Sequence, residues 1–176
     1  MKEISVTIRR AGQQDIPVLA ALFRQHLEYH AQIDERYTPA PDFDPVTLFR
    51  RCLNSSQVIL LVAETAEEVV GFLFGRLLFE EPEPVTFWQW LRRRLRPRPR
   101  IFKYGHILGY ISDCFVVPSA RRQGIGRRLV EAALQWFREY GVEEVEIGVL
   151  PSNRAAGAFW EALGFEPFRL QMRRQP

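Results

Sequence analysis

The sequence predicts an α/β fold, with helices packed against a mixed β-sheet. Three observations support this prediction: alternating apolar stretches typical of strands, apolar residues at helical spacing between them, and a strand, helix, strand order in the second half. That order is typical of a right-handed parallel crossover. The 176 residues, 47% of them hydrophobic, suffice for one core, so a single domain over residues 1–176 is expected.

The first half of the chain predicts a strand, two helices and a β-hairpin. Val6–Arg9 alternates as a short strand does, and Asp15 to about Gln32 carries apolar residues at helical spacing. A second helix begins at Asp44-Pro45, where a natural N-cap precedes a residue that fits the first helical position. Two apolar runs joined by a polar turn, Val58–Glu64 and Val69–Phe79, predict the hairpin.

An insertion over residues 80–106 interrupts this pattern. Its alternating prolines exclude a continuous helix, and arginines and tryptophans are concentrated in it. The regular pattern then resumes with five predicted elements. They are a strand from Ile107 to Val117, a helix from about Gly124 to Tyr140, a strand from Glu143 to Leu150, a helix from about Asn153 to Leu163, and a last strand near Phe165–Met172.

Composition argues against several classes of protein. The two cysteines, Cys52 and Cys114, show no C-x-x-C spacing, which argues against a disulfide framework and a zinc ribbon. The sequence has no long uncharged apolar run and a charged N-terminus, so no membrane span is expected and a cytoplasmic protein is predicted. His26 and His30 share one helical face, but no third ligand is evident and no metal is expected.

The turn before the third major helix is the most informative segment. Gly124 and Gly126 let backbone amides approach a ligand closely, and a helix N-terminus favours an anion. Four arginines lie there, although each is disfavoured by about 0.3–1 kcal/mol at a helix start without a negative partner. The spacing fits neither a Walker loop nor the dinucleotide fingerprint, because Leu129 stands in place of the third glycine.

These residues resemble the GNAT superfamily of acyl-CoA N-acyltransferases. The family signature Q/R-x-x-G-x-G/A is matched by Arg121, Gly124 and Gly126. A later family motif, an Asn that opens a helix ending in an aromatic residue and Gly-Phe, is matched by Asn153, Trp160, Gly164 and Phe165. The resemblance covers about residues 110–172. It implies a largely antiparallel sheet with one splayed parallel pair, flanked by about four helices.

The resemblance also implies how acetyl-CoA is held as co-substrate. In the family, its pantetheine arm lies in the gap between the splayed strands, and the turn cradles its diphosphate. An amide near Phe115 or Val116 would stabilise the oxyanion. The cofactor-binding residues implied in this way are Cys114, Phe115, Val116, Arg121, Arg122, Gln123, Gly124, Ile125, Gly126, Arg127, Asn153 and Trp160.

Three residues are catalytic candidates. Because the amine must lose a proton before it attacks the thioester, a base is needed. Asp113, next to Ser112, is the preferred base, and Glu146 is the second choice. A purely structural role for the Asp113 carboxylate is weighed equally with the role of base. Trp160 replaces the tyrosine that often serves as acid in the family, so Tyr110 or water takes that role. Packing in the core is the plainer reading of Trp160.

The predicted function is transfer of acetyl from acetyl-CoA to a primary amine of a small molecule or a protein. Carboxylates near the first two helices and in residues 80–83 would attract such an amine. Two alternatives stay open: an acyl-CoA-binding domain without catalysis, and a nucleic-acid-binding module that uses Arg92–Arg100. Of the two, nucleic-acid binding is the less favoured. The protein could also form a homodimer.

Overall fold

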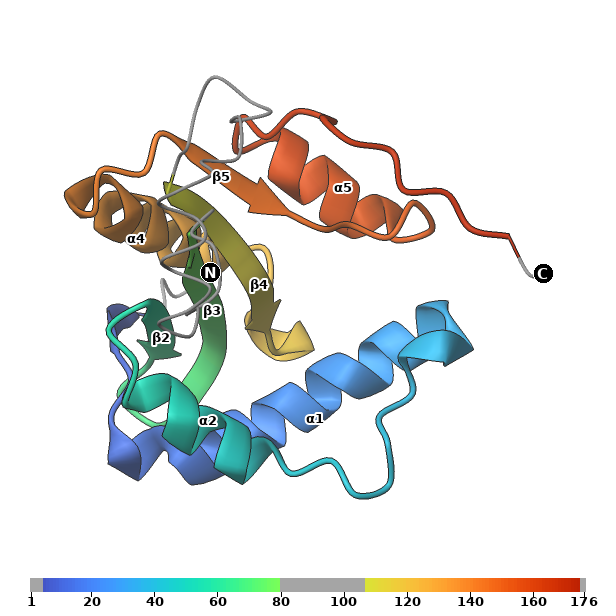
Figure 1. Cartoon of the computed structure of the whole chain (residues 1–176). Coiled ribbons are helices and arrows are strands. Elements are labelled where there is room, and N and C mark those ends of the chain that lie inside the picture. The colour runs from blue at the N-terminus through green and yellow to red at the C-terminus, as the bar shows by residue number, and fades with distance from the viewer. Residues whose placement is uncertain (1–4, 80–106, 175–176) are drawn as a thin grey trace, which may run out of the picture.

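The computed structural model describes residues 5–79 and 107–174, which form one five-stranded sheet with helices on both faces (Figure 1). In spatial order the strands are β1 (Thr7–Arg10), β2 (Val58–Glu64), β3 (Val69–Phe79), β4 (Ile107–Val116) and β5 (Glu144–Ile147). The α-helices in these residues are α1 (Ile16–Ile33), α2 (Pro45–Leu53), α4 (Ile125–Glu139) and α5 (Arg154–Glu161). Successive strands are antiparallel except β4 and β5, which pair in parallel.

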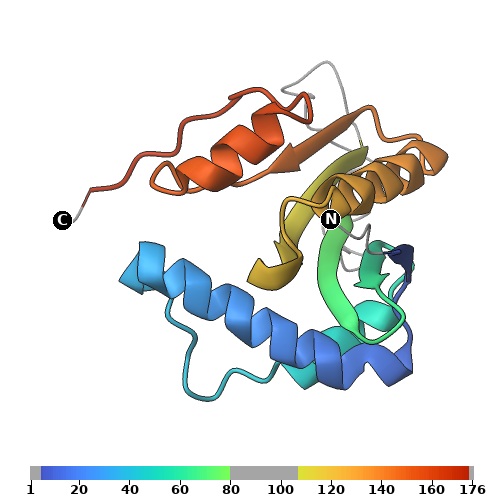
Figure 2. The same ribbon diagram turned by 180° about the vertical axis from the view of Figure 1, so that it is seen from behind.

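Two apolar clusters hold the helices to the sheet. On one face, α1 and α2 pack through residues such as Phe23 and Phe49 against Phe72 of β3. On the other face, α4 packs through Leu129 and Phe137 against β2, β3 and β4. Figures 1 and 2 show α1 and α2 together on one side of the sheet, with α4 on the other and α5 beyond β5. The sheet thus presents two different faces, one to α1 and one to α4.

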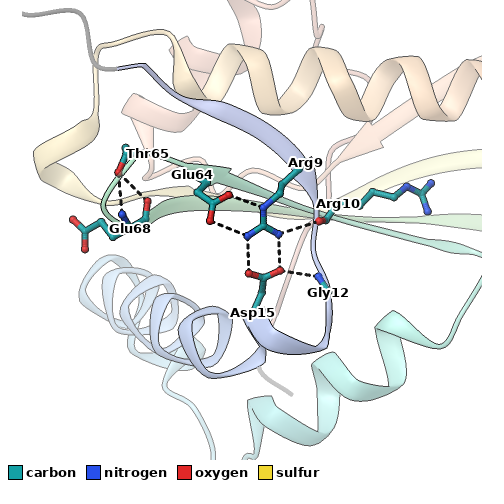
Figure 3. A network of polar contacts seen from close by, with 7 residues as sticks. All are labelled: Arg9, Arg10, Gly12, Asp15, Glu64, Thr65 and Glu68. Carbon is teal, nitrogen blue, oxygen red and sulfur yellow. Dashed lines mark hydrogen bonds and ion pairs between the residues drawn. The ribbon is translucent and has the colours of Figure 1, made fainter.

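A network around Arg9 fixes the start of α1 to the first two strands (Figure 3). The Arg9 guanidinium donates to both Asp15 carboxylate oxygens, at 2.7 and 2.9 Å, and its Nε donates to Glu64 Oε2 at 2.7 Å. Asp15 Oδ2 also accepts from the backbone N–H of Gly12 at 2.7 Å. This arrangement satisfies the buried Asp15 carboxylate, and the guanidinium beside it lowers the pKa of that carboxyl.

The second helix begins as the sequence predicts. The Asp44 carboxylate accepts from the backbone N–H groups of Val46 and Thr47 at 2.9 and 3.2 Å, and Pro45 takes the first helical position. These contacts satisfy amides that a helix start leaves without partners.

A bulge in β4 changes which face its side chains occupy. Phe74 of β3 pairs with Asp113, whereas the next residue, Gly75, pairs with Ile111, so Ser112 is an extra residue on β4. Residues an even number of positions apart share one face of a regular strand. Ile111, before the bulge, packs in the cluster on the α4 face, whereas Phe115, after it, packs in the cluster with α1. The bulge therefore turns Asp113 toward the α1 face.

One predicted strand was wrong. Within the described residues no strand follows α5, and residues 165–174 run extended without pairing. Phe168, Leu170 and Met172 are 69%, 79% and 83% exposed. Alternation predicts an extended backbone, but pairing also needs a partner edge, and β5 has only four residues. The predicted insertion at 80–106 lies outside the described residues.

No helix in residues 5–79 and 107–174 is both long and apolar enough to cross a lipid bilayer.

Candidate active site

Strands β4 and β5 part halfway along β4, leaving a free backbone edge. Their pairing runs from Leu108 and Glu144 to Ile111 and Ile147 and then stops, although β4 continues to Val116. Figure 1 shows the two strands diverging beyond this point. On the side that faces β5, the second half of β4 has no strand partner among the described residues.

The direction of the backbone groups along this edge follows from one hydrogen bond. The Val117 N–H donates to Val70 O of β3 at 2.9 Å, so it points toward β3. Because peptide groups alternate along a strand, those of Phe115 point the same way, and those of Cys114 and Val116 point into the gap. The Phe115 carbonyl lies against Gly71 of β3, which agrees with this alternation.

The loop after β4 turns a row of amides toward the same gap. Arg122 has φ of 64° and Gly124 has φ of 76°, so two left-handed residues flank Gln123 before α4 begins. Gly124 is the N-cap of α4, and it offers no side-chain acceptor to the first backbone N–H groups of the helix. Within the described residues, no protein acceptor meets the N–H groups of residues 122–127. A non-glycine residue in the left-handed region costs about 1–3 kcal/mol and is typical of functional loops.

The arginines of this loop divide into anchored and free ones. Arg121 Nε donates to Val116 O at 2.9 Å, and its guanidinium lies 5.4 Å from the ring centre of Tyr29. Arg127 donates to Ala162 O at 3.2 Å and so joins α4 to the end of α5. The exposed Arg122 side chain makes no contact with a described residue, which leaves its charge available to a ligand. Together the free amides and charges suit an anion.

The far wall of the gap is the start of α5. Asn153 is its N-cap, and the buried Asn153 Oδ1 accepts from Ala156 N at 3.1 Å. The Tyr29 hydroxyl of α1 reaches the same Oδ1 at 3.5 Å. The C-terminal half of α1 is thus placed between the loop and α5.

Two aromatic residues of α5 pack inside this wall. A Cβ on Gly126 would lie 3.1 Å from the Phe159 ring, so the glycine is needed for close packing of α4 on α5. Trp160 is 6% exposed and packs against Phe159 and Phe165. Sequence reasoning connected Gly126 with a ligand and missed its contact with Phe159, because that contact depends on the tertiary position of α5.

The carboxylate of Asp113 meets a histidine that sequence reasoning did not connect with it. His26 Nε2 lies 3.0 Å from Asp113 Oδ1, and the two side chains are 6% and 18% exposed. The His30 ring packs edge-on against the His26 ring with ring centres 4.4 Å apart, and burial lowers the pKa of His30. A helical i, i+4 histidine pair was the signal in the sequence, and surface or pocket-lining histidines were favoured over a metal site for it. Within residues 5–79 and 107–174 no cluster of metal-binding side chains is found.

The other two catalytic candidates lie further along the same face. Tyr110 and Glu146 are register partners across β4 and β5, and both are half-buried. The Arg76 guanidinium lies 5.4 Å from the Tyr110 ring centre, and Arg169 approaches Glu146 Oε1 at 3.8 Å. Tyr110, Glu146 and Asp113 therefore occupy one face of the sheet, on the side of α1 and α2.

Two carboxylates expected to attract an amine have structural partners instead. Asp34 is paired with the Arg36 side chain, and Asp44 caps α2. Glu35 and Asp42 are exposed and carry no ion pair with a described residue. Residues 80–83 lie outside the described residues, as does Arg92–Arg100, which the less favoured nucleic-acid-binding alternative would use.

The fold and this loop define a class of protein that comparison with known sequences identifies. The sequence profile of the Acetyltransferase (GNAT) family matches residues 22–165, which include most of α1, the loop before α4, and α5. The chain belongs to this family. The resemblance found in the sequence is confirmed.

Individual relatives agree with the family. An N-alpha-acetyltransferase from Sulfurisphaera tokodaii is 29% identical over 131 residues, covering 74% of this chain and 70% of that protein. A tetramutant of the BH1408 protein from Bacillus halodurans superposes with a TM-score of 0.77 at 22% identity, covering 97% of this chain and 99% of that one. The aminoglycoside N-acetyltransferase AAC(6')-Iy in complex with CoA superposes with a TM-score of 0.69 at 17% identity, covering 98% and 95%. The two structures confirm the predicted fold class.

Proposed function

We propose that this protein transfers the acetyl group of acetyl-CoA to a primary amine of a small molecule or a protein, by direct attack in a ternary complex. Membership of the GNAT family supports the reaction class. The observation that carries the proposal is the row of free amides at residues 122–127, which lies beside the open edge of β4. A diphosphate and an extended amide-bearing arm are complementary to these two features.

The arm of the co-substrate pairs with β4 in this proposal. The peptide groups of Cys114 and Val116 face the gap and serve as its partners, while those of Phe115 are turned to β3. The diphosphate meets the amides and charges of residues 122–127. Arg121 gives up its bond to Val116 O as the arm enters, and Asn153 borders the arm on the α5 side.

The chemistry uses the face of the sheet that carries Asp113. Its carboxylate takes a proton from the ammonium group, and the neutral amine attacks the thioester carbonyl. The Val116 N–H donates to the oxygen as negative charge develops there, a contact worth about 3 kcal/mol in comparable sites. The carbon–sulfur bond then breaks, and the second proton of the amine passes through Tyr110 or water to the thiolate. Glu146 is the second candidate for the base, and Trp160 acts through packing.

The acceptor is a cationic amine of one of two kinds. The relative from Sulfurisphaera tokodaii is an N-alpha-acetyltransferase, and this likeness supports the amino terminus of a polypeptide as the acceptor. The structural neighbour AAC(6')-Iy is an aminoglycoside N-acetyltransferase, and this likeness supports an amino sugar. The exposed carboxylates Glu35 and Asp42 would attract either class.

Two measurements test this function. Calorimetry at low ionic strength is expected to detect acetyl-CoA binding to the folded protein. Loss of the thioester is then followed with spermidine, an aminoglycoside, free amino acids and a peptide with a free amino terminus, each against a blank without acceptor. Turnover above the blank supports the proposal. Binding without turnover across this panel would favour the non-catalytic acyl-CoA-binding alternative, and no binding would exclude both.

A cytoplasmic location, a single domain over 1–176 and a homodimer stay predictions. Sedimentation velocity measures the assembly state directly.

A further inference from the structure

A buried histidine holds the proposed base of this site. His26 of α1 and Asp113 of β4 are 87 positions apart in the sequence, and their Nε2 and Oδ1 atoms lie 3.0 Å apart. The contact exists because the bulge at Ser112 turns Asp113 to the α1 face. If Ser112 instead took a regular place in the strand, alternation would put the carboxylate on the α4 face with Ile111, away from His26.

Burial assigns different roles to the two partners. The His26 side chain is 6% exposed, and the rings of Phe23, Phe72 and Phe115 lie within 6.0 Å of its own ring centre. The Asp113 side chain is 18% exposed, and its hydrogen bond to His26 uses Oδ1. An incoming ammonium group can therefore reach Asp113 Oδ2, whereas the aromatic rings keep it from His26.

We propose that His26 is a positioning residue for Asp113 in acetyl transfer. The inference rests on the proposed function. His26 donates its Nε2–H to Asp113 Oδ1 and leaves Oδ2 free to take one proton from the ammonium group. The nitrogen–carbon bond then forms, the carbon–sulfur bond breaks, and the second amine proton passes to the thiolate. The proton on Asp113 leaves to water.

Kinetic tests use variants that keep or remove the hydrogen-bond donor. His26→Gln keeps a side-chain N–H donor, and His26→Ala removes it. We expect His26→Ala to lower kcat about 10-fold with KM for acetyl-CoA within about 2-fold. His26→Gln is expected to keep most of the wild-type kcat, because its amide still donates to Asp113. Glu28→Gln, on an exposed position of α1, is the matched control.

Imidazole NMR of the free protein tests the pair without turnover. The chemical shift of the His26 Nε2–H is expected to change in Asp113→Asn and to stay unchanged in Glu28→Gln. A His26 signal that is insensitive to Asp113→Asn would overturn the inference, and so would a His26→Ala enzyme with the wild-type kcat. Wild-type protein that turns over no acceptor in the panel would reject the proposed function itself, and this inference with it.

Discussion

Gly126, near the start of α4, lies directly against the ring of Phe159 in α5. A Cβ at this glycine would approach both Cε2 and Cζ of the ring to 3.1 Å. The family signature requires a small residue here, and in this chain the packing of two helices gives a reason for it that is independent of a ligand. A substitution at Gly126 thus changes the α4–α5 contact as well as the loop.

Gly126→Ala is expected to stabilise the fold only when Phe159 is made smaller. Alanine gains about 1 kcal/mol over glycine in a helix, but overpacking against a ring costs about 1–3 kcal/mol. In a Phe159→Leu background the crowding is relieved and the helical gain remains. A double-mutant cycle by urea unfolding measures the coupling, and additive free energies would show that the two side chains do not oppose each other.

Gln123→Glu isolates the charge of the loop from its shape. The substitution adds one negative charge at an exposed side chain between Arg122 and Gly124. Repulsion of a diphosphate is expected to weaken acetyl-CoA binding by about 1 kcal/mol, or roughly 5-fold, and less at high salt. Calorimetry measures this change, with the exposed Gln25→Glu as control. Equal affinity for both variants would mean that the diphosphate does not bind here.

Asp15→Asn is expected to destabilise the protein by about 2 kcal/mol, because it breaks the ion pair with Arg9 around a carboxylate that is only 5% exposed. Chemical unfolding measures the loss, and Asp42→Asn, the same change at an exposed residue, is expected to have little effect. A loss no greater than that of Asp42→Asn would show that the Arg9 network does not stabilise the fold.

The same pair predicts an acid limb of stability. Arg9 lowers the pKa of Asp15 from its ordinary 3.8, so the unfolded chain binds a proton at higher pH than the folded protein does. The stabilisation is complete above pH 3.8 and is lost as pH falls through the folded-state pKa. Unfolding free energies across this range should fall less steeply in Asp15→Asn, and parallel curves would contradict the assignment.

His30 predicts a second pH dependence, closer to neutrality. Burial lowers the pKa of His30 below its ordinary 6.5, so its neutral form is favoured in the folded protein. Stability is full above pH 6.5 and declines as pH falls toward the folded-state pKa. Denaturation of wild type and His30→Gln at about pH 5 and about pH 8 compares the two, and the variant is expected to show the smaller difference.

The sequence predicted the elements whose signals are local. An N-cap followed by proline at Asp44-Pro45 and a polar turn between Glu64 and Val69 each fix structure over a few residues, and the structure has both. The loop before α4 was found in the same way, because glycines and arginines gathered at a helix start form a short pattern that favours an anion.

Features that depend on tertiary register were missed. Strand alternation places Asp113 on the same face as Ile111, and only the pairing with β3 reveals the extra residue between them. The contact between His26 and Asp113 follows from that register and has no local signature. The strand expected at Phe165–Met172 failed for a related reason, because alternation says nothing about whether a partner edge is present.

The extra residue in β4 also constrains how this chain can change length. Removing Ser112 would restore a regular strand in which Ile111 and Asp113 are neighbours on opposite faces, so the carboxylate and the Phe115 ring would stay on the side of α1. A residue lost from positions 113–116 would instead turn part of the strand over. Members of the family should accordingly tolerate a gap at position 112 more readily than at positions 113–116, and a sequence alignment with its gap at 112 would keep inward residues paired with inward ones.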